Sequence, residues 1–499
     1  MSHHALMFGV ANNSVQRSPG AHRIATVLRE HEWDVEVIDY TALWSLAELQ
    51  ELVRSRVTGS TVFFGFSTIF SSWDPSLNAF TRWLKDTYPN IKIVIGGNSV
   101  ALTNAENIDY WVDGYGEVAA IELARSLTGN TGPALRFDME QFGTRRLIKA
   151  TTSYPAYPMP SYRTLYEARD FMQPFEWGTM ELSRGCKFTC KFCAVPLLGV
   201  KEDQSVPAED FEYALRYNYD NFGIQNYYIT DETFNDRSEK IEKYAQVVER
   251  MPFRPFFSGY LRLDILTAHP EMRELLVRMN YGGHQFGIET FNHASGKVVG
   301  KGMNPERVKS ALLDNKEYFK SSALDFYRCN LSFIVGLPYE TRETQMATID
   351  WLDVNWQDQS AGMAPLYIAN AKSRKEHTKI SDFGEDLRKH GLRELSSNVT
   401  WPELHYPINR PNNNEHSFLW EHDTMNIVEA YELASLGRDR IVPVTRMDNW
   451  MLHLPFFKQQ GTVSWDSVEP LKKRDWYDNT GLLHETGFVR RYIDSKLNL

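Results

Sequence analysis

The sequence predicts an α/β protein: an N-terminal doubly wound parallel sheet, a central partial β/α barrel and a C-terminal mixed or helical cap. Three observations predict this order. Short β-branched runs alternate with amphipathic segments over residues 1–130, and the alternation returns over residues 176–365. Residues 131–175 lack this pattern and contain Pro155, Pro158 and Pro160, which indicates a linker. Residues 366–499 are irregular.

In the first unit, helix-like segments separate the strand-like runs. The runs start at Ala5, Asp34, Thr61 and Ile91, and the helix-like segments are residues 22–31, 46–55 and 77–88. Strands separated by such helices form parallel sheets, whose binding loops lie beyond the carboxyl ends of the strands. We therefore expect any ligand of this domain to contact residues that follow a strand.

The second unit contains six strand-like runs with helices between them. They are residues 179–183, 226–230, 256–260, 282–289, 329–336 and 364–369. Six parallel strands give an incomplete barrel, and functional residues of such barrels gather at the carboxyl ends of the strands.

The C-terminal region is rich in aromatic and imidazole side chains, and half of the 14 histidines follow residue 370. These side chains include Trp401, His405, His416, Trp420, His422, Trp450 and His453. Two interpretations stay open: a packed cap with surface or hydrogen-bonded histidines, or a lid that faces the substrate.

Composition excludes little. Lys and Arg number 54 against 64 Asp and Glu, which gives a formal charge of −10. This balance argues weakly against non-specific binding to the phosphate backbone of nucleic acid. We find no apolar run of about 18 residues, so we expect neither a membrane span nor a secretory leader. A cytoplasmic location is the expectation.

The four cysteines point to metal or redox chemistry. Cys186, Cys190 and Cys193 lie within eight residues, and Cys329 stands alone. Such clustering in a large chain suits a metal site in a reducing compartment better than a disulfide framework. Cys329 is expected to be a small buried apolar residue.

The cysteine spacing, with Gly185 before it, lets one loop curl around a [4Fe-4S] cube. Three protein ligands leave one iron open, and that iron can bind the amino and carboxylate groups of S-adenosylmethionine. Zinc is the alternative, but it usually needs a fourth Cys or His, and the nearby sequence supplies none.

Here the sequence resembles the radical S-adenosylmethionine (SAM) superfamily, which has three cysteines at this spacing and an aromatic residue before the last. Phe192 occupies the aromatic position, and the resemblance implies that it packs near the adenine. Further matches follow in order and imply a cofactor-binding set. The set is Asp231 and Glu232 beside the methionine ammonium, Arg262 with Asp264, Glu289 with the later Lys301-Gly302, and Ile334, Gly336, Leu337 and Pro338 along the adenine.

The N-terminal unit is similar to the branch of that superfamily with a cobalamin-binding-type domain. Its closing segment from Asp109 to Glu117 and the run Ile95-Gly96-Gly97 resemble motifs of those domains. There is no Asp-x-His-x-x-Gly motif, so bound cobalamin would lack that histidine ligand, or the domain retains only the fold. The methylthiotransferase branch is disfavoured because it needs three further cysteines, and none precedes Cys186.

The resemblance implies an enzyme that reductively cleaves SAM to methionine and a 5′-deoxyadenosyl radical, which abstracts hydrogen from an unactivated carbon. Cobalamin-dependent methyl transfer is the first subclass. The second is a cobalamin-free isomerase or modifying enzyme, for example one acting on substituted thymine in bacteriophage DNA. Expected partners are a small-molecule or modified-base substrate and a donor such as flavodoxin or ferredoxin. A non-catalytic iron–sulfur or zinc scaffold is the alternative from another class.

Overall fold

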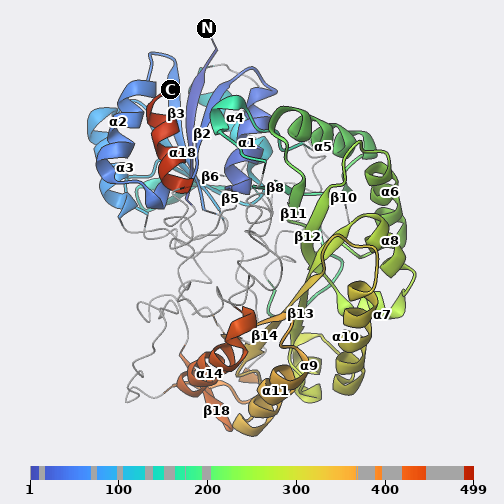
Figure 1. The fold of residues 1–499 in the computed structure, drawn as a ribbon. Coiled ribbons are helices and arrows are strands. Elements are labelled where there is room, and N and C mark those ends of the chain that lie inside the picture. The colour runs from blue at the N-terminus through green and yellow to red at the C-terminus, as the bar shows by residue number, and fades with distance from the viewer. Residues whose placement is uncertain are drawn as a thin grey trace.

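The fold is described from a computed structural model of the chain. The residues described are 2–10, 17–68, 76–97, 105–129, 139–150, 163–174, 176–193, 204–366, 368, 388–395, 419–445 and 488–499. Figure 1 shows the N-terminal sheet with its helices beside a curved wall of strands whose outer side is covered by helices.

The N-terminal domain is built on a seven-stranded sheet in the order β2-β1-β3-β4-β5-β7-β6. All pairs are parallel except β6 with β7. The strands are β1 (His4–Gly9), β2 (Asp34–Ile38), β3 (Thr61–Ser67), β4 (Lys92–Gly96), β5 (Tyr110–Asp113), β6 (Met139–Phe142) and β7 (Arg145–Lys149). The four strands predicted from the sequence are all present.

Helices cover both faces of this sheet. They are α1 (Pro19–Arg29), α2 (Leu46–Arg56), α3 (Leu77–Thr87) and α4 (Gly116–Leu127). Helix α2 begins with a capping box, in which Ser45 and Glu48 satisfy each other's backbone N–H groups. The alternation of side chains along the strands divides the apolar residues into separate cores on the two faces.

Part of the predicted linker belongs to this domain. Strands β6 and β7 lie within residues 131–175, and β7 pairs with β5. Leu165 also contacts this domain, because its backbone N–H donates to Thr26 Oγ1 on α1 at 3.0 Å. The prediction of a linker over this range is therefore wrong for residues 139–149, and the three prolines lie outside the described residues.

The second domain contains a six-stranded, wholly parallel sheet in the order β8-β11-β12-β13-β14-β15. Its strands are β8 (Trp177–Met180), β11 (Asn226–Ile229), β12 (Phe256–Leu261), β13 (Tyr281–Glu289), β14 (Arg328–Val335) and β15 (Ser360–Pro365). The outer helices are α5 (Ala208–Phe222), α6 (Ser238–Glu249), α7 (Leu263–Ala268), α8 (Met272–Arg278), α9 (His293–Val299), α10 (Pro305–Lys320) and α11 (Arg342–Asn355). A short pair, β9 (Ser183–Arg184) and β10 (Gln204–Ser205), lies beside this sheet.

The last strand is shifted from its predicted position. The sequence placed it at residues 364–369, whereas β15 starts at Ser360 and ends at Pro365. Its small residues give a weak strand pattern, and proline cannot donate to a following ladder.

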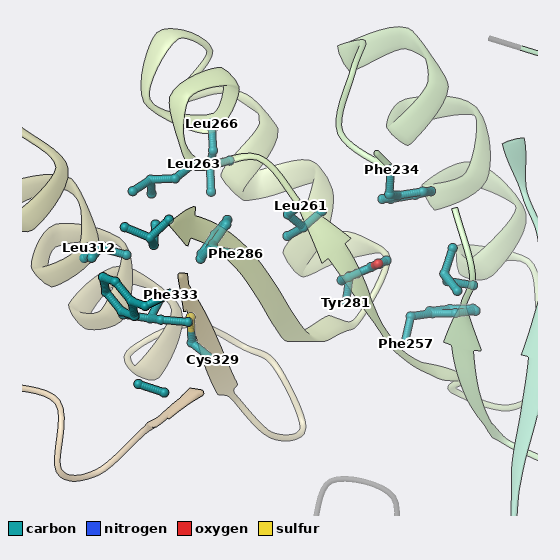
Figure 2. Packing of buried hydrophobic residues seen from close by; sticks show 14 of the residues in the cluster. Phe234, Phe257, Leu261, Leu263, Leu266, Tyr281, Phe286, Leu312, Cys329 and Phe333 are labelled. Carbon is teal, nitrogen blue, oxygen red and sulfur yellow. The ribbon is translucent and has the colours of Figure 1, made fainter. Parts of the chain in front are cut away.

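Alternate residues of the barrel strands face the lumen and the outer core. On β14, Cys329, Leu331, Phe333 and Val335 are buried in the core, whereas Asn330 and the alternate residues after it are half-buried. Figure 2 shows Cys329 among the apolar side chains of this core. The expectation that Cys329 is a small buried apolar residue is confirmed.

The described helices of the C-terminal region pack on both domains. Helix α14 (Ile427–Thr445) packs on β15 and α11 and so extends the outer helical layer, next to the small sheet of β16 (Arg393–Glu394), β17 (Trp420–His422) and β18 (Met425–Asn426). Helix α18 (Phe488–Leu497) packs on the N-terminal domain instead (Figure 1). Of the seven named aromatic and histidine residues, only Trp420 and His422 are described.

Among the described residues, no helix has the length and apolar character needed to cross a membrane.

Candidate active site

The three clustered cysteines lie on the loop that follows β8 and β9, at the carboxyl end of the barrel. All three thiols are half-buried. Gly185 starts the loop with a φ of 103°, a conformation that favours glycine. Two backbone bonds fix the loop: Lys191 N–H donates to Val299 O on α9 at 3.3 Å, and Cys193 N–H donates to Cys190 O at 3.1 Å.

Arg262 places a positive charge beside this loop. Its NH1 group donates to Cys190 Sγ at 3.3 Å, and its guanidinium lies 3.7 Å from the centre of the Phe188 ring. Asp264 accepts from the other two guanidinium nitrogens, at 3.0 and 2.6 Å. The motif of Arg262 and Asp264 therefore faces the cysteines.

The two acidic residues after β11 point in different directions. Asp231 is buried and accepts from Leu182 N–H at 2.7 Å and from the Ser183 hydroxyl at 2.6 Å. Burial raises its pKa to about 7. Glu232 instead accepts from the Tyr115 hydroxyl at 2.9 Å and from Gly185 N–H at 3.3 Å. Asp231 thus stabilises the segment before the cysteines, whereas Glu232 contacts the start of the cysteine loop.

Glu289 ends β13 in an unusual backbone conformation. Its φ is 68°, which is rare for a residue with a side chain. The carboxylate is buried and lies 3.7 Å from the Lys301 ammonium, which also donates to Gly287 O at 2.8 Å. Burial raises the pKa of Glu289, and Lys301 opposes that rise.

The turn after β14 is held by a buried acid. Glu340 accepts from Gly336 N–H and Leu337 N–H, both at 3.1 Å, and from the Thr290 hydroxyl at 2.5 Å. Burial raises the pKa of Glu340 to about 7. The φ of Gly336 is 92°, and a Cβ atom there would overlap the indole of Trp420.

The remaining predicted residues lie around this turn and the loop. Phe192 is half-buried against the barrel core, and Ile334 is one of the half-buried residues of β14 that alternate with the core residues. Leu337 is fully buried, and Pro338 O accepts from the Ser295 hydroxyl at 2.7 Å. The barrel thus brings all the predicted site residues to its carboxyl end, except that Asp231 and Leu337 face inward.

A cavity of about 330 Å³ lies between the two domains. One side is apolar and runs between α1, α4 and the N-terminal sheet, where the lining includes Met7, Ile24, Phe63, Val94, Ala120 and Ala124. Gly97 and Gly114 line it at the strand ends, with φ values of 143° and 128°. The barrel side is polar and includes Glu181, Arg184, Thr230 and Glu232.

An ionic network forms the polar wall of this cavity. Arg184 pairs with Glu117 at 2.6 Å and with Glu181 at 2.5 Å, and its guanidinium lies 3.9 Å from the centre of the Tyr115 ring. Two positive side chains hold the pKa of Glu117 at about 2, since Arg23 also lies 3.2 Å from its carboxylate. The network joins the closing motif of the N-terminal domain to the residue two before Cys186.

The donor set suits an iron–sulfur cluster. Within the ranges that the structure describes, no three His, Cys, Asp or Glu side chains converge closely enough to enclose one metal ion. The loop offers three thiols, Arg262 after β12 donates a hydrogen bond to one of them, and thiolates spaced around a cube are what a cluster requires. Cys329 faces the outer core and is not part of this set.

Comparison with known families identifies the barrel. Residues 180–352 match the family model of the radical SAM superfamily, from the end of β8 into α11. The barrel is a radical SAM domain. The match begins just before the cysteine loop and includes every predicted ligand residue from Phe192 to Pro338.

Curated relatives of the chain are named as methyl- and methylthiotransferases. The uncharacterized methyltransferase PH0819 of Pyrococcus horikoshii is 26% identical over 366 residues, which are 67% of this chain and 73% of that protein. The ribosomal protein uS12 methylthiotransferase RimO of Bradyrhizobium sp. is 24% identical over 46% of this chain and 53% of its own length. The chain thus spans about half the length of RimO.

Solved structures share the fold. The radical SAM methyltransferase TsrM of Kitasatospora setae, bound to tryptophan and a SAM analogue, has a TM-score of 0.60 at 16% identity and covers 80% of each chain. The cobalamin-dependent SAM radical enzyme OxsB has a TM-score of 0.55 at 16% identity, covering 78% of this chain and 56% of that one. The predicted fold, a cobalamin-binding-like sheet before a radical SAM barrel, is confirmed.

Sequence reasoning missed the residues that join the domains. Tyr115 and Arg184 were not singled out, although Glu117 was part of a recognised motif. Glu340 was not singled out either. The one available signal was the position of Arg184 directly before the cysteine loop. An arginine that becomes buried at such a place needs carboxylate partners, because an unpaired buried charge is costly.

Proposed function

We propose that this enzyme binds a [4Fe-4S] cluster through Cys186, Cys190 and Cys193, binds SAM at the open iron, and holds cobalamin in the cavity between the domains. With these groups it would transfer a methyl group to an unactivated carbon of a small-molecule substrate. The observation that supports this most is the cavity itself, because one continuous space is lined by the carboxyl ends of both sheets.

The residues at the barrel mouth suit SAM. When bound, the cluster supplies an electron to the sulfonium of SAM. Glu232 offers a carboxylate that can accept from the methionine ammonium. Glu289 with Lys301 offers one charge of each sign, and the half-buried Ile334 beside the turn Gly336–Pro338 offers an apolar contact for the adenine. Asp231 is left out of this set because buried donors already occupy its carboxylate.

The cavity suits a corrinoid that has no histidine ligand. Its apolar part lies between helices and sheet, and backbone without side chains at Gly97 and Gly114 allows a bulky ligand to approach closely. Among the described residues that line it, none is a histidine. Cobalamin held there would face the cysteine loop across Arg184 and Glu232.

The test uses anaerobically reconstituted protein, purified with and without added hydroxocobalamin. We expect iron and sulfide near four each per chain, a corrinoid spectrum that survives gel filtration, and 5′-deoxyadenosine or methylated product with reductant and SAM. Cys190→Ala should lose the cluster, whereas Cys329→Ala, a cysteine outside the site, should keep it. An active protein that never retains a corrinoid would favour a cobalamin-free modifying enzyme, and a protein without iron would refute the proposal.

A further inference from the structure

Both the backbone and the side chain of Arg262 are fixed by hydrogen bonds within the protein. Its backbone is fixed from both sides by Asn235, whose side chain accepts from Arg262 N–H at 2.7 Å and donates to Arg262 O at 3.0 Å. Asn235 is itself fully buried. The backbone of Arg262 is therefore anchored at the end of β12, facing the cysteine loop.

The guanidinium is also fixed. Asp264 occupies the Nε and NH2 donors, the Phe188 ring lies against the guanidinium plane, and NH1 is left to point at Cys190 Sγ. The Arg262 side chain is 11% exposed. Because the pair with Asp264 has no net charge, what remains at the cysteine is one directed N–H donor.

We propose that Arg262 is a positioning residue that sets the reduction potential of the cluster by donating a hydrogen bond to the sulfur of Cys190. This inference rests on the cluster of the proposed function. A one-electron reductant such as dithionite adds negative charge to the cluster and its thiolates, and no bond is formed or broken. An N–H donor to a ligating sulfur stabilises the more negative state and raises the potential.

The resemblance to the superfamily assigned Arg262 to SAM binding, and the geometry points elsewhere. The Nε–NH2 pair, which presents two parallel donors to a carboxylate, is already used by Asp264. A SAM carboxylate would have to displace Asp264 or accept single bonds from the other edge. The two roles can be separated by experiment. A residue that binds SAM changes SAM affinity, whereas a donor to Cys190 changes the reduction potential of the cluster even without SAM.

The experiment is a redox titration of the reconstituted cluster without SAM, followed by electron paramagnetic resonance. In Arg262→Met, which has no N–H donor, we expect the reduction equilibrium constant to fall by about tenfold, the effect of one hydrogen bond to a charged group. Arg262→Lys, which still has an N–H donor, should recover part of this loss. Arg254→Met is the control, because Arg254 lies just before the opposite end of β12 and pairs with Asp325.

Iron content and SAM affinity are measured on the same samples. An unchanged potential in Arg262→Met with full iron would overturn the inference, as would a loss confined to SAM affinity. If Arg262→Met does not retain iron, wild-type protein labelled with ¹⁵N-arginine decides: the reduced cluster should show hyperfine coupling to an arginine nitrogen, and no coupling would overturn the inference. Wild-type protein without any cluster would refute the proposed function instead.

Discussion

Gly336 is a residue at which a single methyl group should matter. Its φ of 92° is strained for alanine, and the indole of Trp420 fills the space where a Cβ would lie. We expect Gly336→Ala to lower the free energy of unfolding by about 2 kcal/mol or more and to weaken SAM binding. Chemical denaturation and calorimetry measure these effects.

Gly59→Ala is the control for Gly336→Ala. Gly59 has open space where a Cβ would lie and no left-handed φ, so its replacement should change neither quantity. Equal stability of the two variants would contradict the account of the turn.

Glu340 should make stability depend on pH. Its folded pKa is about 7 against an ordinary value of 4.5, so the folded protein binds more protons than the unfolded chain between these values. Its contribution is therefore full below about pH 4.5 and is lost as the pH rises through about 7. The difference in unfolding free energy between wild type and Glu340→Gln should fall over this range, by up to about 3 kcal/mol.

Denaturant titrations at a series of pH values measure that difference. The exposed Glu343, at the start of α11, provides the comparison, and Glu343→Gln should not reproduce the slope. A difference for Glu340→Gln that is constant with pH would show that its carboxyl titrates normally.

At the scale of elements, α18 is a component of the N-terminal core. Tyr492 on this helix accepts from Asp39 N–H at 2.9 Å, and its ring lies 4.5 Å from the Arg17 guanidinium. Tyr492→Phe leaves a buried N–H without its acceptor and should cost about 1–2 kcal/mol. Hydrogen exchange of β2 amides should speed up accordingly, whereas Tyr213→Phe, on the exposed side of α5, should leave them unchanged.

The elements that the sequence predicted are those with strong local patterns. β3 and β14 are rich in apolar residues, and the burial of Cys329 on β14 agrees with the expectation for a lone free cysteine. β7 and α18 were missed because their partners, β5 and α2, are distant in the sequence. Local propensity does not contain that pairing information.

The site could be predicted to a similar extent. The cysteines and the strand-end residues follow from spacing and strand polarity, since parallel strands bring their carboxyl ends together. The direction of each side chain did not follow: Asp231 and Glu232 are neighbours, yet one faces the core and the other the cavity. That choice is set by Ser183 and Tyr115, which belong to other segments.

At the scale of the whole molecule, the cavity between the domains should be separable from the cysteine loop. Ala120 on α4 lines the cavity from the N-terminal side. Ala120→Trp fills this space and should lower cobalamin affinity at least about tenfold, since a core site cannot absorb the added volume. Iron content and SAM binding should stay at the wild-type level.

Ser126→Trp adds the same side chain at an exposed position of α4 and should leave cobalamin binding intact. Absorbance of retained corrinoid after gel filtration compares the variants. Full retention by Ala120→Trp would place the corrinoid elsewhere in the enzyme.

The position of α18 also determines when the N-terminal domain can complete its core during synthesis. Asp39 and Tyr492 are 453 residues apart, and Val489, Tyr492 and Ile493 fill one side of the N-terminal core. A ribosome releases the seven strands of that sheet long before it makes this helix. During synthesis the apolar face that α18 covers therefore stays exposed, and the N-terminal domain completes its core only after the barrel has been translated.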